Sequence, residues 1–153
     1  MSKQSIIQTL TQLSHLLSPI TSRWIIIGTT GLMLSGYDVE PNDIDILTDK
    51  ETASLINSLL KPYEKPVQLK DDGKFRSAFS RYVIGDVSIE LMGNLQVNTV
   101  NGWVDVLPLI TDPQKIVLNG SNFTIPSKTE QASIYTLFGR QKDEAALKLL
   151  STI

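Results

Sequence analysis

We expect a mixed α/β (α+β) fold, in which helices pack against a β-sheet, and three features of the sequence predict it. A stretch with helical spacing opens the chain, and apolar runs then alternate with short helical stretches as far as residue 60. The middle of the chain has the two-residue period of strands. The C-terminal part returns to helical spacing. This order is typical of a sheet covered by helices.

Size and composition restrict the class of protein further. The chain has 153 residues, so we expect residues 1–153 to form a single domain. Cysteine is absent, which excludes disulfides and thiolate metal sites. The net charge of -2 gives no sign of a general nucleic-acid binder. The N-terminus does not resemble a signal peptide, and no apolar run approaches the roughly 20 residues that span a bilayer, so the predicted location is cytoplasmic, away from membranes.

The first part of the chain predicts a helix, a strand and a second, short helix. Residues 4–17 place apolar side chains at helical spacing, so a helix is expected there. Trp24–Ile27 is a short apolar run closed by Gly28, which is typical of a buried strand. Thr29–Leu34 is expected to form the short helix that follows it.

A second strand and a third helix come next. Asp43–Leu47 alternates acidic and apolar residues with the period of a strand. Thr48 and Glu51 have the spacing of a capping box. This spacing predicts a helix over about 51–60, with its apolar residues on one face.

Turn signals divide the middle of the chain into strands. Asp72-Gly73 and Gly85-Asp86 are both turn-forming pairs. Residues 75–84 and 87–92 are therefore predicted to be paired strands.

The last part of the chain predicts a hairpin and two terminal helices. Asn119-Gly120 is the strongest hairpin signal in the sequence, because both residue types tolerate the turn conformation. Ser127 and Glu130 form a second capping box, which opens a helix. Gly139 is expected to interrupt this helix before a last helical stretch over Lys142–Leu150.

Asp43 and Asp45 are the first candidates for chemistry. Side chains two residues apart on a strand share one face, so these two carboxylates lie side by side while Ile44 points into the core. Adjacent carboxylates repel each other unless they are solvated or share a cation. Mg²⁺ prefers one or two carboxylates together with substrate phosphates. A solvated acidic strand end remains the alternative for this pattern taken alone.

The segment before this pair is a candidate phosphate site. Ile25–Gly31 reads as a strand, a glycine turn and a helix start. Backbone amides at a helix start bind phosphate oxygens, and a glycine lets a ligand approach the backbone. Thr29 and Thr30 would add hydroxyl donors. The alternative is a tight turn in which a threonine caps the helix.

Glu90 is the candidate for a third carboxylate. It alternates with Ile89 and Leu91, so it lies on the polar face of an apolar strand. A two-metal site needs such a third carboxylate beside the aspartate pair. Asp86 and Asp105 are competitors for this position, and an outward-facing surface glutamate is the alternative.

Residues 25–48, IIIGTTGLMLSGYDVEPNDIDILT, resemble the signature of the nucleotidyltransferase superfamily, which has the polymerase β-like fold. In that signature a strand ends in Gly-Gly or Gly-Ser, and a short helix and Asp-x-Asp follow. The likeness is greatest to small antibiotic nucleotidyltransferases and to the nucleotidyltransferase partners of toxin–antitoxin pairs. It extends to residues 75–94, which contain Glu90, and to residues 126–150, where Gly139–Asp143 is similar to a Gly-Arg-x-Lys-Asp motif.

The chain departs from this signature at three positions. Thr29 stands where the family has its second glycine or serine, and Val39 stands where an arginine is frequent. Glu90 stands where the third carboxylate is often an aspartate. Both aspartates of the pair are present.

The resemblance implies a mixed β-sheet of the nucleotidyltransferase fold, with flanking helices and C-terminal helices, and a metal-dependent transfer reaction. A hydroxyl acceptor would attack the α-phosphorus of a nucleoside triphosphate (NTP), and pyrophosphate would leave. The catalytic residues and the ligands of Mg²⁺ (or Mn²⁺) would be Asp43, Asp45 and Glu90. The residues that bind the triphosphate would be Gly28, Thr29, Thr30, Arg140 and Lys142.

Two other functions remain open from the sequence. One is a catalytically weak or inactive nucleotide- or protein-binding module of the same fold that acts with a partner, which the changes at Thr29 and Val39 favour. The other is a nucleotide-sugar glycosyltransferase, where Asp-x-Asp also binds metal, although the Gly28 turn fits that class poorly. The acceptor is unknown: it is a small molecule, a protein or an RNA. A homodimer or a partner protein would complete the acceptor site of so short a chain.

Four further residues are weighed for a role near the site. Arg76 and Arg81 lie on the predicted strand 75–84 and either border the site or line its outer face. Trp24 and Trp103 are expected to pack in the core or against the sheet.

Overall fold

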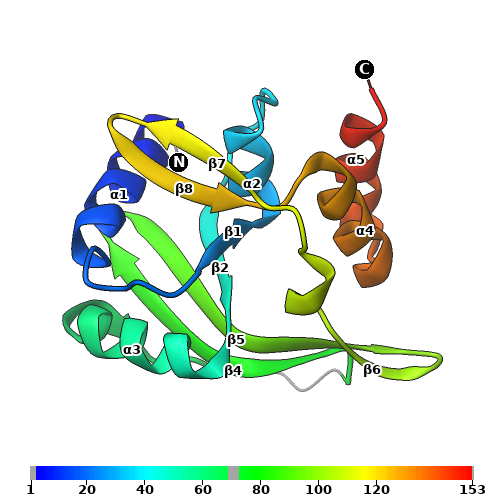
Figure 1. Ribbon diagram of the computed structural model, residues 1–153, viewed down its shortest axis with the longest axis horizontal. Helices are drawn as coiled ribbons and strands as arrows, with labels where there is room; N and C mark the ends of the chain where they lie inside the picture. The colour runs from blue at the N-terminus through cyan, green and yellow to red at the C-terminus, as the bar shows by residue number, and fades with distance from the viewer. Residues whose placement is uncertain (1–2, 69–72, 153) are drawn as a thin grey trace.

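The computed structural model describes residues 3–68 and 73–152 (Figure 1). Helices pack against a mixed β-sheet, so the predicted fold class is confirmed. Within the described ranges, every helix is too short or too polar to cross a membrane. The elements in chain order are α1 (Lys3–Leu16), β1 (Ile25–Ile27), α2 (Gly28–Leu34), β2 (Asp43–Thr48), α3 (Lys50–Leu60), η1 (Lys61–Tyr63), β3 (Glu64–Lys65), β4 (Phe75–Ile84), β5 (Val87–Thr99), β6 (Gly102–Asp105), η2 (Leu107–Leu109), β7 (Gln114–Leu118), β8 (Ser121–Ile125), α4 (Lys128–Phe138) and α5 (Gln141–Leu150).

The main sheet places β2 and β5 at its centre. Its strands lie in the order β1-β2-β5-β4-β3, and β6 pairs with β5. β2 and β5 run parallel, while the other neighbouring strands of this sheet are antiparallel. A separate hairpin of β7 and β8 lies beside β1 and α1 (Figure 1).

The two faces of the sheet build two different cores. α1 and α3 cover one face, and Ile44 of β2 and Ile89 of β5 point into the core between them and the sheet (Figure 1). On the opposite face, Leu47 and Met92 pack with Phe138 of α4. Because residues alternate along a strand, Asp43, Asp45 and Glu90 lie on the same face as this second core.

β5 changes face part-way along its length. Leu91 points into the core with α1 and α3, whereas Leu95 and Val97 point into the core with α4, although all three are odd-numbered residues. Between them, Asn94 has a φ of 55°, and the pairing register with β4 shifts. These are the features of a β-bulge. The bulge adds apolar side chains to the face that carries Glu90, which simple alternation does not predict.

Of the two predicted hairpins, one is confirmed and the other has a longer second strand than expected. β7 and β8 are joined at Asn119-Gly120, where φ is 49° and 79°, as in a type I′ turn. β4 and β5 are joined at Gly85-Asp86 as expected, but β5 extends to Thr99 instead of ending at residue 92. Asp72 of the predicted Asp72-Gly73 turn lies outside the described residues.

The capping box predicted at Thr48 is wrong. The N-cap of α3 is Asp49, whose carboxylate accepts a hydrogen bond of 2.7 Å from the backbone N–H of Thr52. The hydroxyl of Thr48 instead donates to the carbonyl of Arg23. Strand β2 runs on through Thr48, so its side chain is buried in the sheet and cannot cap the helix.

The capping box at the start of α4 is present and also holds a loop. One carboxylate oxygen of Glu130 accepts from the N–H of Ser127, as predicted, and the other accepts from the N–H groups of Thr111 and Asp112 at 2.6 and 2.8 Å. Burial raises the pKa of Glu130, but these backbone donors outweigh it and lower the pKa below the usual 4.5. The charged form of Glu130 is therefore the one that stabilises the fold.

Glu130→Gln is expected to lower the free energy of unfolding by about 1–2 kcal/mol at pH 7, because charge-assisted bonds to three backbone donors are weakened. A group whose folded pKa is depressed loses its stabilising effect as the pH falls, so the difference should shrink below pH 4.5. Urea unfolding at pH 7 and pH 4 measures both effects. Glu51→Gln, which removes an exposed glutamate from the first turn of α3, is the matched control. Equal stability of the two variants at pH 7 would contradict this role.

Candidate active site

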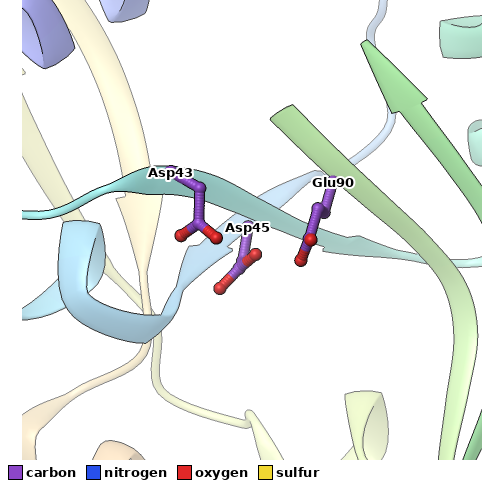
Figure 2. A group of neighbouring side chains, drawn as sticks. All are labelled: Asp43, Asp45 and Glu90. Atoms are coloured by element: carbon purple, nitrogen blue, oxygen red, sulfur yellow. The ribbon is translucent and has the colours of Figure 1, made fainter. Parts of the chain in front are cut away.

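Three carboxylates converge at the centre of the sheet. Asp43 and Asp45 come from β2, and Glu90 comes from β5, where it is the direct cross-strand partner of Asp45. One carboxylate oxygen of each residue lies within 4.8 Å of the others. Figure 2 shows the three side chains pointing to the same side of the strands. The structure thus brings Glu90, and neither Asp86 nor Asp105, beside the aspartate pair.

The group carries more negative charge than its surroundings neutralise. Burial raises the pKa of Asp45 well above 3.8, and the charges of Asp43 and Glu90 raise it further. Burial, followed by the charge of Glu90, also raises the pKa of Asp43. Lys142 opposes both shifts through its positive charge. None of the ion pairs among the described residues involves these carboxylates.

The surroundings of Asp45 fit a bound metal ion. Its Oδ1 is buried and has no hydrogen-bond partner among the described residues. A buried carboxylate oxygen without a donor costs free energy, and a cation held between several carboxylates removes that cost. Oxygen ligands are those that Mg²⁺ and Mn²⁺ prefer. The donor set of Asp43, Asp45 and Glu90 therefore fits a divalent cation.

Gly28 packs directly against this group. It begins α2 with a φ of 72°, a conformation that other residues rarely adopt. A Cβ added to Gly28 would lie 2.6 Å from Oδ2 of Asp45. A glycine is therefore required here to leave room for a carboxylate of the site. Gly28 also lines the cavity described below, and its role in letting a ligand approach stays a prediction.

Gly28→Ala is expected to destabilise the fold by about 1–2 kcal/mol through backbone strain, and also to weaken binding of a divalent cation because Asp45 must move. Gly120→Ala is the matched control, since Gly120 also has a positive φ of 79° but no atom lies within 4 Å of an added Cβ. Thermal unfolding and calorimetric titration with Mn²⁺ measure the two effects. The interpretation fails if Gly28→Ala binds Mn²⁺ as tightly as Gly120→Ala.

The two threonines after Gly28 differ in their surroundings. Thr29 is exposed and lines the cavity described below. Thr30 is buried, and its hydroxyl donates to the carbonyl of Asp43 at 2.6 Å, so the prediction of a free hydroxyl donor at Thr30 is wrong. No side-chain hydrogen bond caps α2, which also excludes a threonine cap.

Arg140 and Lys142 lie close together but have different partners. Arg140 forms two hydrogen bonds with the buried carboxylate of Asp143, at 2.8 and 3.0 Å, and its guanidinium packs on the rings of Phe75 and Phe138. Lys142 forms no ion pair among the described residues, and its charge acts on Asp43 and Asp45. Lys142 is therefore the cation free to meet a ligand, while Arg140 fixes the start of α5.

A cavity of about 900 Å³ opens beside the carboxylates. It brings together seven of the eight predicted site residues, all except Thr30. Sequence reasoning missed Tyr135, which lines the cavity and whose pKa is raised by burial and by the charges of Asp143 and Asp45. Its helical spacing with Phe138 predicts a core residue, so the sequence gives no signal for this hydroxyl.

The far side of the cavity is formed by β4, β5 and β6. Phe75, Phe79, Met92, Leu95 and Trp103 line it, and we refer to these five residues as the apolar wall. Trp103 does not lie in the core, since 36% of the residue is exposed. It packs against the sheet, which is the other predicted alternative, with the guanidinium of Arg76 4.0 Å above its ring. Trp24 is half-buried and packs edge-on against Phe123, as expected.

Arg76 and Arg81 differ in their position relative to the cavity. Arg76 lines the cavity, where its Nε donates to the side chain of Gln96. Arg81 donates to Ser88 and does not line the cavity. Of the two arginines weighed from the sequence, only Arg76 borders the site.

A mixed sheet with Asp-x-Asp on one central strand, a glycine turn before it and a third carboxylate on the parallel neighbour defines a nucleotidyltransferase. The model of the aminoglycoside-2''-adenylyltransferase family matches residues 9–149. The chain belongs to that family, so the predicted superfamily and enzyme class are confirmed. A search of curated protein sequences found no match.

Solved structures show the same fold. A presumed nucleotidyltransferase of Thermotoga maritima (TM1012) is 25% identical with a TM-score of 0.81, over 97% of this chain and 93% of that one. ANT(2'')-Ia in complex with adenylyl-2''-tobramycin is 10% identical with a TM-score of 0.64, over 95% and 87%. The lincosamide adenylyltransferase LnuA, bound to lincomycin, is 14% identical with a TM-score of 0.60, over 100% and 98%. The last two establish the fold alone.

Proposed function

We propose that this chain transfers adenylate from ATP to a hydroxyl acceptor, with Mg²⁺ (or Mn²⁺) held by Asp43, Asp45 and Glu90. The buried Oδ1 of Asp45, which has no hydrogen-bond partner within a group of three carboxylates, is the observation that carries the metal site. The family to which the chain belongs supports the choice of adenylate.

The reaction exchanges one phosphorus–oxygen bond for another. The acceptor oxygen forms a bond to the α-phosphorus of ATP, and the bond from that phosphorus to the β-bridging oxygen breaks. Pyrophosphate takes the electron pair of the broken bond, and the hydroxyl proton leaves to a carboxylate of the group or to water. Bound Mg²⁺ would supply charge neutralisation on the phosphates and a lowered pKa of the acceptor hydroxyl.

The residues around the carboxylates would bind the triphosphate. The first turn of α2 has backbone N–H groups without partners in the helix, and these belong to Gly28 and its neighbours beside Asp45. Thr29 adds a hydroxyl on the cavity surface, and Lys142 adds a positive charge. Both kinds of donor are suited to phosphate oxygens.

Incubation of the purified chain with each α-labelled NTP and Mg²⁺ tests the proposal, with calorimetry of MgATP binding as the direct measurement. We expect ATP to bind in the presence of Mg²⁺ and not in the presence of EDTA. Label should pass to an acceptor with release of pyrophosphate. Absence of metal-dependent NTP binding would overturn the proposed function.

A further inference from the structure

Tyr135 of α4 carries a hydroxyl that the fold itself does not use. Its ring lies in an apolar cluster with Leu32 of α2 and Ala146 of α5, and only 7% of the residue is exposed. None of the described residues forms a hydrogen bond with this hydroxyl. The residue lines the cavity, and its oxygen is not one of the fully buried atoms that lack a partner, so the hydroxyl opens into the cavity. Since a tyrosine this buried usually has a partner for its hydroxyl, the open one indicates a ligand.

The groups around this hydroxyl show what kind of partner it lacks. Burial, and then the charges of Asp143 and Asp45, raise the pKa of Tyr135 above its usual 10, while Arg140 opposes them. The hydroxyl therefore keeps its proton and acts as a donor. Asp143 is already engaged, because both of its carboxylate oxygens accept from Arg140. The missing partner is thus an acceptor that a ligand brings into the cavity.

The terminal helices α4 and α5 pack side by side and bring Tyr135 and Lys142 to the same cavity (Figure 1). The charge of Lys142 acts on Asp43 and Asp45, and Asp45 in turn acts on Tyr135. If the proposed function holds, phosphate oxygens of ATP share the metal ion with these two aspartates, because Mg²⁺ binds through carboxylates together with substrate phosphates. We infer that Tyr135 binds the triphosphate, and that its hydroxyl donates to a phosphate oxygen beside Lys142. This inference rests on the proposed function, which supplies the nucleotide.

The alternative acceptor is Asp45, which Tyr135 would then position. Oδ1 of Asp45 has no hydrogen-bond partner among the described residues, so Tyr135 does not donate to it even though both groups are free. A metal ion at the carboxylates would occupy this same oxygen, which leaves the phosphates as the acceptor for the hydroxyl. The two roles differ in a measurable way, because a residue that positions Asp45 affects metal binding without nucleotide, whereas a residue that binds phosphate does not.

Tyr135→Phe removes the hydroxyl and keeps the ring in its apolar cluster. We expect this variant to bind MgATP about 10-fold more weakly than wild type, because a hydrogen bond to a charged phosphate is lost. Magnesium tripolyphosphate, which has the phosphates without the nucleoside, should lose affinity by the same factor. Binding of Mn²⁺ without nucleotide should stay at the wild-type value, and the unfolding temperature should not fall. Calorimetry with the three probes and thermal unfolding measure these quantities.

Tyr37→Phe is the matched control. Tyr37 packs against the same apolar cluster, and its buried hydroxyl also has no partner among the described residues, but Tyr37 does not line the cavity. This variant should bind MgATP and tripolyphosphate as wild type does, since it removes an unpartnered hydroxyl that no ligand reaches.

Several results would overturn the inference and leave the proposed function intact. They are wild-type affinity of Tyr135→Phe for MgATP or tripolyphosphate, no binding of tripolyphosphate by wild type, and an equal loss of affinity in Tyr37→Phe. Weaker Mn²⁺ binding by Tyr135→Phe would show that the hydroxyl positions Asp45, and a lower unfolding temperature would show that it serves the fold. Absence of metal-dependent ATP binding by wild type would instead overturn the proposed function, and this inference with it.

Discussion

Replacing both Asp43 and Asp45 with asparagine is expected to abolish Mg²⁺-dependent ATP binding and to lower adenylate transfer about 1,000-fold or more. The reason is that the metal site loses two of its three carboxylates, and metal ions contribute several kcal/mol to such transfers. Asparagine keeps the shape of aspartate, so the sheet should remain folded. Calorimetry with MgATP and release of pyrophosphate measure the two effects.

For the metal-free protein, we expect the same double variant to retain more stability than wild type as the pH rises. A carboxyl group whose folded pKa is raised binds more protons in the folded state, so stability falls as the pH rises from 3.8 through the folded pKa. In EDTA, wild type should therefore lose stability as the pH rises above 3.8, and the double variant should lose less. Thermal unfolding across this range tests it. Unchanged ATP affinity in Mg²⁺, or an equal loss of stability with pH, would remove the metal site.

The local pattern of the sequence was sufficient to predict the carboxylate group. Asp43 and Asp45 share a face because they are two residues apart on a strand, and Glu90 lies on the polar side of an apolar strand. What the pattern alone could not give is that β2 and β5 are parallel neighbours with Asp45 opposite Glu90. That pairing joins residues far apart in the sequence, and only the resemblance to a family pointed to it.

The errors have a common physical origin, since each depends on contacts between distant residues. Thr30 has the right residue type and position for a phosphate donor, but its hydroxyl donates a hydrogen bond to the backbone carbonyl of Asp43. Ile89, Leu91 and Leu95 are all odd-numbered residues of β5, yet the bulge at Asn94 sends Leu95 to the other face. Trp103 is large and apolar, and it still lies at the surface beneath Arg76. Composition and period do not contain this information.

Glu90→Gln is expected to separate binding from turnover. Asp43 and Asp45 remain to hold a metal ion with the triphosphate, so the affinity for MgATP should change little. Transfer should fall about 100-fold or more, because Glu90 would hold the metal ion that activates the acceptor. Single-turnover kinetics with labelled ATP, beside calorimetry of MgATP, measure the two quantities on the same preparation.

Glu40→Gln is the matched control for this last variant, because Glu40 lines the same cavity and is exposed but does not belong to the carboxylate group. It should leave both binding and transfer close to wild type. A wild-type chain that binds MgATP but transfers no label to any acceptor would be a nucleotide-binding module acting with a partner, and Glu90→Gln would then have no turnover to lose. Equal transfer by the Glu90→Gln and Glu40→Gln variants would instead show an active enzyme that does not use Glu90, and would restrict the metal site to the two aspartates of β2.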